Sequence, residues 1–182
     1  HKLIVIEDAC HALGAKYYGK KIGSCRHSAM AVFSFHPVKS ITTGEGGAIL
    51  TSSKKYYEKL KLLRNHGIYK DKDGKNVMVE LGFNYRITDL SAALGLSQLK
   101  KLDGFIIKRR EIIKRYKREF KNVAGVILPR ELENNYSAWH IYVIRTSKQK
   151  DRDKLTAYLN GHGVGVNFHY PAVYSHPYYR RH

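Results

Sequence analysis

Several features that mark specialised protein classes are scarce or missing in this sequence. Its 182 residues include only two cysteines, Cys10 and Cys25, which excludes a disulfide framework and a metal site built from paired cysteines. No apolar run approaches the roughly 20 residues that a membrane-spanning helix needs. The chain opens on His1 and runs directly into a short apolar segment, without the pattern of a signal peptide. We therefore expect a cytoplasmic protein with no membrane partner.

Acidic residues are few relative to basic ones. The 33 Lys and Arg residues against 15 Asp and Glu residues give a formal net charge of +18. Such an excess favours anionic partners, such as phosphates, nucleotides or nucleic acid. Basic residues concentrate in Lys100–Lys121, where apolar residues recur at helical spacing, as in an amphipathic helix with a solvated basic face. Because no base-reading motif is present, we expect no nucleic-acid partner, and a basic nucleic-acid-binding fragment is kept as an alternative.

The order of apolar runs and turn signals predicts an α/β fold in two domains, with a change of composition near residues 121–125. We expect a larger α/β domain over residues 1–122 and a smaller αβ domain over residues 123–182. In the larger domain, strands are predicted at Lys2–Ile6, Ala29–Phe35 and Gly47–Thr51. Helices are predicted at Lys54–Arg64 and from the N-cap Thr88 to Leu99, and a long basic helix follows to about Phe120. A loop is predicted at Tyr69–Lys75. In the smaller domain, strands are predicted at 126–128, 139–145 and 164–168, and a helix from Asp151 to Gly161.

The predicted strands of the larger domain are too few for a complete parallel sheet. Parallel strands need crossover connections, and nothing precedes the first short strand. Only about a dozen residues separate the second and third strands, so these two are expected to be antiparallel or not adjacent. We therefore expect the chain to be the middle of a longer protein.

Lys39 is the most informative single residue. It follows the apolar strand that carries Ser34 and precedes a glycine-rich turn, within Phe33–Gly47. Asp8 ends the first apolar strand, so the acid and the lysine can meet at one edge of a sheet. This pairing suits a pyridoxal phosphate (PLP) enzyme, in which the lysine forms a Schiff base and the acid holds the pyridinium nitrogen. The alternatives are a turn aspartate and a solvated surface lysine.

Two neighbours of this pair could complete a cofactor site. His11 lies three residues after Asp8 and could contact the phenolic oxygen of the cofactor or cover its ring. The hydroxyl of Ser34 could bind the phosphate. An Asp-x-x-His metal pair lacks a third ligand with suitable spacing, so no metal is expected. A structural histidine is the alternative for His11.

Two further segments carry candidate binding residues. Asn84 and Arg86 lie in Gly82–Arg86, just before a predicted helix, and could reach a phosphate; a simple turn is the alternative. His169 and Tyr170 follow the last predicted strand and could line a substrate pocket; aromatic packing is the alternative.

Together these segments resemble the DegT–DnrJ–StrS family of PLP-dependent sugar aminotransferases. The resemblance covers nearly the whole chain, and it implies a partial PLP-dependent transferase fold of the aspartate aminotransferase type (fold type I), with a smaller αβ C-terminal domain. The motifs that carry it, in the order of the family, are Glu7–Ala12, Phe33–Lys39, Thr43–Ala48, Gly82–Ile87, Ala138–His140 and His169–Pro171.

The resemblance implies a role for each candidate residue. Lys39 is the catalytic Schiff-base lysine, and Asp8 pairs with the pyridinium nitrogen. His11 contacts the phenolic oxygen, and Ser34 binds the phosphate. Asn84 reaches the phosphate of the neighbouring subunit's cofactor, which implies a homodimer with shared active sites. The substrate-binding residues are Arg86, His169 and Tyr170.

The implied reaction moves an amino group to a 4-keto-6-deoxy sugar nucleotide in polysaccharide or glycan biosynthesis, with the amino acid glutamate as the expected donor. Glu7–Ala15 is most similar to enzymes that aminate C4 of UDP-4-keto-6-deoxy-N-acetyl-altrosamine, and perosamine-type enzymes are nearly as similar. A fold-type-I PLP protein of the sugar dehydratase kind is the alternative, but that branch has histidine where this chain has Lys39. Family members also carry segments before and after this region, so we expect the chain alone to be inactive, to bind PLP weakly and to self-associate.

Overall fold

The computed structural model describes residue 1 and residues 3–181. The chain forms two compact units that alternate along the sequence: unit 1 comprises residues 1–119 and 130–142, and unit 2 comprises residues 120–129 and 143–182. Each unit is described by itself. The boundary between the predicted domains, at residues 122 and 123, stays a prediction. Among the described residues, no helix is both long enough and apolar enough to cross a membrane.

The central sheet of unit 1 has three strands in the order β1-β4-β5. Strand β1 (Ile6–Asp8) is parallel to β4 (Met30–Ser34). Strand β5 (Gly47–Leu50) pairs antiparallel with β4, which is one of the two arrangements expected from the short connection. The first strand was predicted at Lys2–Ile6, of which Lys2 lies outside the described residues; the ladder with β4 sets it instead at Ile6–Asp8. An apolar run of this kind is typical of a buried strand, but here Ile6 is 56% exposed.

A second three-stranded sheet in unit 1 was not predicted. Strands β2 (Lys16–Tyr17) and β3 (Lys20–Lys21) form a hairpin, and β2 also pairs with β9 (Asn135–Tyr136). The two turn residues, Tyr18 and Gly19, both have positive φ, as a tight type I′ turn requires. This sheet brings the 130–142 segment, distant in sequence, against the N-terminal part of the chain.

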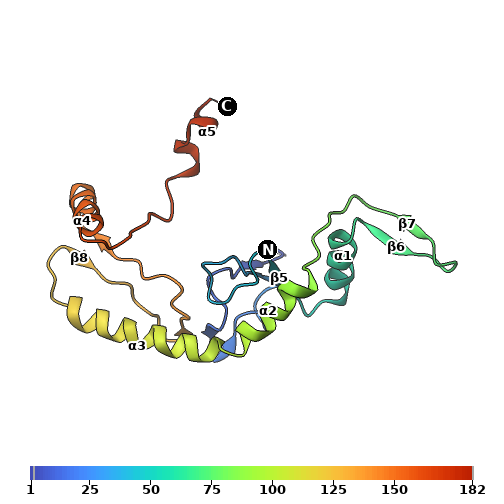
Figure 1. The fold of residues 1–182 in the computed structure, drawn as a ribbon, viewed down its shortest axis with the longest axis horizontal. Coiled ribbons are helices and arrows are strands. Elements are labelled where there is room, and N and C mark those ends of the chain that lie inside the picture. The colour runs from blue at the N-terminus through green and yellow to red at the C-terminus, as the bar shows by residue number, and fades with distance from the viewer. Residues whose placement is uncertain (2, 182) are drawn as a thin grey trace. The chain divides into compact units, whose positions relative to one another are not determined.

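The helices of unit 1 begin and end close to their predicted positions. Helix α1 is Lys54–Arg64, α2 is Asp89–Leu99 with Thr88 as its N-cap, and α3 is Leu102–Phe120. The predicted loop at Tyr69–Lys75 is partly wrong, because its ends form the hairpin of β6 (Ile68–Lys70) and β7 (Asn76–Met78), which extends beyond α1 (Figure 1).

The core of unit 1 consists of two small clusters. One contains Ala9, Ala31 and Phe33 around the central sheet. The other joins α3 to the second sheet and contains Ala15, Ile41, Leu102, Ile106 and Ala138. Burial of each large aliphatic side chain contributes about 1.5–3 kcal/mol, so this cluster fixes α3 against the segments that carry the candidate site.

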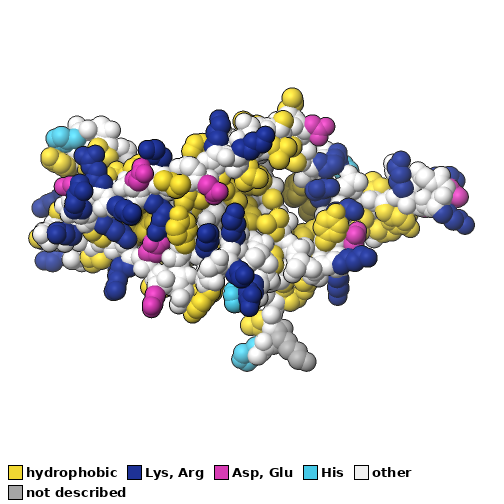
Figure 2. Space-filling model, turned by 90° about the horizontal axis from the view of Figure 1, so that it is seen from below, with side chains coloured by type: hydrophobic (Ala, Val, Ile, Leu, Met, Phe, Trp, Pro, Cys, Tyr) yellow, Lys and Arg dark blue, Asp and Glu magenta, His cyan; other side chains and the backbone are white. Residues whose placement is uncertain are grey.

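Many apolar side chains are exposed on the described chain, and they lie among basic side chains on the face shown in Figure 2. Helix α2 has no buried residue, and its Leu90 and Leu96 are 87% and 64% exposed. A helix with apolar residues on every side is usually covered by other protein. The exposed surface of α2 is therefore more apolar than is usual for a helix that faces solvent.

Unit 2 contains a short antiparallel pair and one long helix. Strand β8 (Val126–Ile127) pairs with β10 (Arg145–Thr146), and α4 spans Gln149–Gly161. The turn η1 (Val173–Ser175) and the short helix α5 (Pro177–Arg180) follow.

Two strands predicted in this part of the chain are wrong or shortened. In the predicted strand 164–168, the backbone N–H of Val164 donates to the carbonyl of Leu159, and Gly163 has φ +75°. This closes α4 in the manner of a Schellman motif, so Val164 is used by the helix end. In the predicted strand 139–145, Trp139 has φ +48° and only Arg145 enters a strand.

Candidate functional site

Asp8 lies at the carboxyl end of β1 with its side chain exposed. Its Oδ1 accepts a hydrogen bond of 3.1 Å from the backbone N–H of Cys10. The hydrogen bond from the Cys10 thiol, followed by this backbone bond, holds the pKa of Asp8 below its ordinary value. Asp8 therefore presents a stably ionised carboxylate that a cationic group could reach.

Cys10 is a partner of Asp8 that sequence reasoning missed. Burial, and then the hydrogen bond and negative charge of Asp8, raise the pKa of its thiol. The thiol sulfur also lies 3.8 Å from the carbonyl oxygen of Val32 on β4. Cys10 thus remains a neutral donor, whose single hydrogen can go either to Asp8 or to the carbonyl oxygen of Val32 on the neighbouring strand.

Lys39 follows β4 in a tightly bonded connection. Its own backbone N–H donates to the carbonyl of His36 at 2.9 Å, and Thr43 donates to the carbonyl of Phe35 at 3.0 Å. The side chain of Lys39 is half-buried, and its positive charge contributes to lowering the pKa values of both Asp8 and Cys10. The structure therefore brings the lysine and the acid to the same edge of the sheet, as expected for the ends of parallel strands.

Ser34 is the last residue of β4. In the ladder Asp8 lies opposite Val32, so Ser34 is two residues further towards the same edge. Its Oγ accepts a hydrogen bond of 3.3 Å from the backbone N–H of His36. A hydroxyl can accept and donate at once, so Ser34 can still donate to an anion such as phosphate.

The glycine-rich turn shapes this edge through close backbone approach. Gly46 has φ +149°, and a Cβ on Gly47 would lie 2.6 Å from the carbonyl oxygen of Phe33. The hydroxyl of Thr43 donates to the carbonyl of Glu45 at 2.7 Å inside the turn. Larger residues at Gly46 or Gly47 would push β5 away from β4 and disturb the connection that carries Lys39.

His11 lies near Asp8, because its charge contributes to lowering the pKa of Asp8. The His11 ring also contacts the ring of His140, with centroids 4.5 Å apart and an interplanar angle of 57°. Sequence reasoning did not select His140, although it lies in the Ala138–His140 motif.

Asn84 and Arg86 are held by a different part of unit 1. Asn84 forms an isolated β-bridge with Asn65, the C-cap of α1, and Nη1 of Arg86 donates to Oδ1 of Asn65 at 2.7 Å. The described contacts of both residues are thus with the end of α1 and not with Asp8 or Lys39. Their predicted roles in binding stay predictions.

His169 and Tyr170 belong to unit 2, where their rings contact each other at 4.7 Å. The guanidinium of Arg152 lies 4.8 Å from the ring of the preceding residue, Phe168. The roles of His169 and Tyr170 in binding substrate stay predictions.

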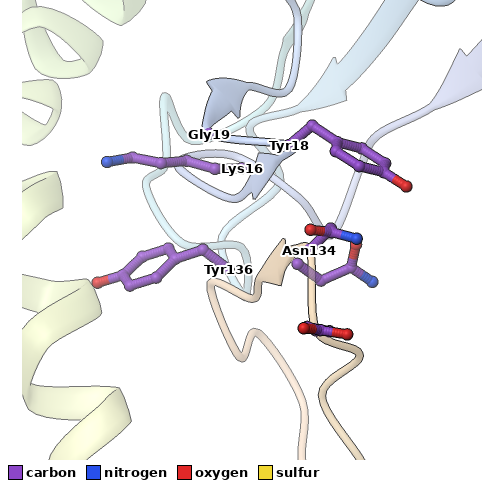
Figure 3. Close-up of a pocket in the computed structure, with 7 residues that line it drawn as sticks. Lys16, Tyr18, Gly19, Asn134 and Tyr136 are labelled. Carbon is purple, nitrogen blue, oxygen red and sulfur yellow. The ribbon is translucent and has the colours of Figure 1, made fainter.

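Two cavities open on unit 1 around the second sheet. One of about 420 Å³ has Lys16 and Tyr136 extending to one side and Tyr18 to the other (Figure 3). The other, of about 550 Å³, includes Glu7 and Ala12, which neighbour Asp8 and His11 in sequence. None of the predicted site residues lines either cavity. Within the described residues, no group of three or more His, Cys, Asp or Glu side chains is arranged to hold a metal ion.

Comparison with protein families extends these observations to the whole chain. The model of the DegT/DnrJ/EryC1/StrS aminotransferase family matches residues 1–182. The chain belongs to this family. Six motifs in the order found in the aminotransferase family had led to the same assignment from sequence.

Individual relatives of this aminotransferase family agree. The UDP-4-amino-4,6-dideoxy-N-acetyl-beta-L-altrosamine transaminase of Campylobacter jejuni is 40% identical over 183 residues, which cover 100% of this chain and 48% of the relative. The solved structure of PseC from Helicobacter pylori, an aminotransferase involved in the biosynthesis of pseudoaminic acid, has a TM-score of 0.90 and 35% identity, covering 100% of this chain and 49% of that one.

A third relative was solved with its cofactor state named. A protein of Streptococcus pneumoniae described as a sugar aminotransferase, in its PLP-form, has a TM-score of 0.87 and 27% identity over 98% of this chain and 46% of that one. The predicted fold is therefore confirmed as α/β and as part of the fold-type-I transferase architecture. The chain spans about half the length of the curated relatives it matches.

Proposed function

We propose that this chain is part of a PLP-dependent aminotransferase that acts on a sugar nucleotide. The observation that carries the proposal is the meeting of Asp8 and Lys39 at one edge of the sheet, in a chain of an aminotransferase family. A carboxylate kept ionised beside a half-buried lysine is a donor set that suits a cofactor with a cationic ring nitrogen and an aldehyde.

The residues of the sheet edge fit PLP group by group. Asp8 would hold the ring nitrogen, because its carboxylate is exposed and its pKa is lowered by the Cys10 thiol. Ser34 would donate to the phosphate from the end of β4. His11 would contact the phenolic oxygen, and Lys39 would hold the cofactor covalently through Nζ.

When bound, PLP supplies an electron sink for the carbon from which a proton is removed. The chemistry left to the chain is positioning and proton transfer. The carboxylate of Asp8 keeps a proton on the ring nitrogen by stabilising its positive charge. Nζ of Lys39, once its amine is free, takes one proton and returns it to a neighbouring carbon, which is general acid–base catalysis by a single group.

The proposed substrate is a 4-keto-6-deoxy hexose linked to UDP, in glycan or polysaccharide biosynthesis, with glutamate as the amino donor. The 40% identity to an altrosamine transaminase supports this class. Arg86 could pair with a carboxylate or phosphate, because its guanidinium is exposed and anchored by Asn65. His169 and Tyr170 are proposed to contact the sugar nucleotide.

We further propose a homodimer in the cytoplasm whose subunits share their active sites. The separate anchoring of Asn84 and Arg86 at the end of α1 supports this arrangement, since it leaves both side chains exposed and able to serve a partner's cofactor. The apolar, exposed surface of α2 is compatible with burial in such an assembly.

The experiment is an absorbance titration of the intact protein with PLP, followed by borohydride reduction and peptide mapping. We expect a Schiff-base band and a reduced label on Lys39 alone. The matched control is Lys70→Ala on the exposed β6–β7 hairpin, which should leave both signals unchanged. A label on another lysine, or no Schiff-base band, would refute the proposal.

A further inference from the structure

The segment that leads to His140 is fixed by two arginines of α3. Nη1 of Arg109 donates to the carbonyl oxygens of Trp139 at 3.3 Å and of His140 at 3.1 Å. The neighbouring Ala138 is 1% exposed and belongs to the buried cluster that joins α3 to the second sheet. The backbone of His140 is therefore attached to the helix and not to a strand ladder.

A part-buried ion pair fixes the residues just before it. Nη1 and Nη2 of Arg110 donate to the two carboxylate oxygens of Glu131 at 2.8 and 3.0 Å. Oε1 of Glu131 accepts the backbone N–H of Ser137 at 2.6 Å, and Arg110 also donates to the carbonyl of Ser137 at 2.9 Å. The pair lowers the pKa of Glu131, chiefly through the hydrogen bond from Arg110. Ser137 is thus held at both its backbone groups.

The chain then turns sharply at Trp139. Oγ of Ser137 accepts the backbone N–H of Trp139 at 3.1 Å, and Trp139 has φ +48°, the left-handed region that non-glycine residues rarely adopt. Such a conformation persists only where its surroundings determine it. Here the surroundings are the hydrogen bonds from Arg109 and to Ser137. They fix the backbone at Trp139, and with it the direction in which the His140 side chain leaves the chain.

The ring of His140 reaches the candidate cofactor site. It contacts the ring of His11 at a centroid distance of 4.5 Å, and His11 acts electrostatically on Asp8. We propose that His140 is a positioning residue of this site: its backbone is held by α3, and its ring fixes the orientation of the His11 imidazole. The role of His11 towards the cofactor rests on the proposed function, whereas the ring contact belongs to the chain alone.

The first experiment needs no cofactor. The ring signals of His11 are followed by NMR in the full chain and compared with His140→Ala and His140→Phe. We expect His140→Ala to shift and broaden the His11 signals, and His140→Phe, which keeps a ring, to restore much of the ordered signal. The matched control is His27→Ala, which removes an imidazole that packs on Tyr17 at 5.5 Å. Unchanged His11 signals in His140→Ala would overturn the proposal.

The second experiment uses the intact protein with PLP. We expect His140→Ala to weaken PLP binding about 3- to 10-fold, the factor that one lost ring contact is worth, and to shift the Schiff-base absorbance in the same direction as His11→Ala. The double variant should lose no more than His11→Ala alone, because the two residues act through one another. Independent, additive effects would overturn the positioning role.

A third variant covers the case in which His140→Ala does not fold. Arg109→Gln leaves both rings in place but removes the guanidinium that holds the carbonyls of Trp139 and His140. It should move the His11 signals in the same direction as His140→Ala, by a smaller amount. If a folded Arg109→Gln variant leaves the His11 signals unchanged, that result contradicts the proposal. If wild-type protein fails to bind PLP while the NMR coupling persists, the proposed function fails and the positioning of His11 by His140 stands.

Discussion

Two parts of unit 1 carry predicted binding residues, and they are built differently. The first, which we call the sheet-edge group, consists of Asp8, His11, Ser34 and Lys39 at the ends of β1 and β4. The second, the Asn84–Arg86 segment, precedes α2. In the sheet-edge group, the charges of His11 and Lys39 act on Asp8, so these side chains lie close together.

The Asn84–Arg86 segment is instead bonded to the end of α1. Its Tyr85 donates a backbone hydrogen bond to the carbonyl of Arg64 at 3.0 Å, and Arg86 donates to Asn65. The side chains are exposed, and Tyr85 is 70% exposed. We infer that the two parts have different roles. The sheet-edge group can contact one ligand with all its side chains, whereas the Asn84–Arg86 segment is anchored with its side chains exposed and can contact a ligand bound at another site. The predictions below test that difference in role.

The largest effect is expected at Lys39. Lys39→Ala removes both the covalent attachment and the proton-transferring amine, so turnover of the intact enzyme should fall by at least ~10³-fold, within the range for positioned proton-transfer groups. The fold should survive, because Lys39 is only half-buried and its backbone bond to His36 remains. Turnover with a keto-sugar nucleotide and circular dichroism measure the two outcomes. Substantial activity in a folded Lys39→Ala variant would contradict the role of the sheet-edge group.

The next effect is expected at Asp8. Asp8→Asn keeps the shape and removes the charge, so PLP can still bind while the ring becomes a poorer electron sink. We expect turnover to fall by at least ~10²-fold. Glu7→Gln is the matched control, because Glu7 is the adjacent residue of the same strand and lines a cavity that Asp8 does not. Equal losses in the two variants would mean that strand stability, and not the Asp8 charge, is being measured.

The parts of the fold with local signals were predictable from sequence. Helix α1 spans Lys54–Arg64 as predicted, and Thr88 caps α2, because propensity and capping act over a few neighbouring residues. The length of the connection between β4 and β5 excluded parallel neighbours, and the structure shows the antiparallel one of the two remaining arrangements. The position of Asp8 and Lys39 at one edge of the sheet could be predicted because each residue follows the end of a predicted strand.

Two of the failures, at Trp139–Arg145 and at His140, come from long-range contacts. The alternation around Trp139–Arg145 predicted a strand, but Arg109, about thirty residues earlier, takes the carbonyl oxygens that a ladder would need. For the same reason His140 was not recognised as a neighbour of His11, since only the fold brings the two rings together. The hydrogen bond between the Cys10 thiol and Asp8 is a local contact. The short sequence separation of the two residues was the signal that could have predicted it.

A smaller effect is expected at the Asn84–Arg86 segment, and it tests the proposed sharing of sites. Asn84→Ala should weaken PLP binding by about 10-fold, the factor for one lost hydrogen bond to a charged group. At a PLP concentration near the wild-type dissociation constant, where Asn84→Ala sites are mostly empty, mixing equal amounts of Lys39→Ala and Asn84→Ala subunits should restore about a quarter of wild-type activity, because half of the dimers are mixed and each has one intact site. Activity that does not rise on mixing, in dimers shown to exchange subunits, would place Asn84 in its own subunit's site.

The smallest effect concerns the ionisation of Asp8 within the sheet-edge group. The hydrogen bond from the Cys10 thiol is the main cause of its lowered pKa, and the backbone N–H of Cys10 is the second. Cys10→Ala removes the first and keeps the second, so the pKa of Asp8 should rise part of the way to its ordinary value. Cys10→Ser keeps a hydroxyl donor and is the matched control. Carboxyl ¹³C NMR titration of the chain without cofactor measures the change.

The same interaction has a defined sign in stability. Because the pKa of Asp8 is lower in the folded chain than in the unfolded one, ionised Asp8 stabilises the fold at pH values above its unfolded pKa, and this contribution is lost as the pH falls through the folded pKa. Part of the stability difference between wild type and Cys10→Ala should therefore be present at pH 6 and disappear in acid, whereas the loss of packing persists at both.

In the reverse direction, Asp8→Asn should lower the pKa of the Cys10 thiol, since the Asp8 hydrogen bond and charge contribute to raising it. Faster alkylation of Cys10 in Asp8→Asn at a fixed pH is the expected result; an unchanged rate, together with an unchanged Asp8 titration in Cys10→Ala, would mean that the two side chains are not coupled and that the sheet-edge group is organised by Lys39 and His11 alone.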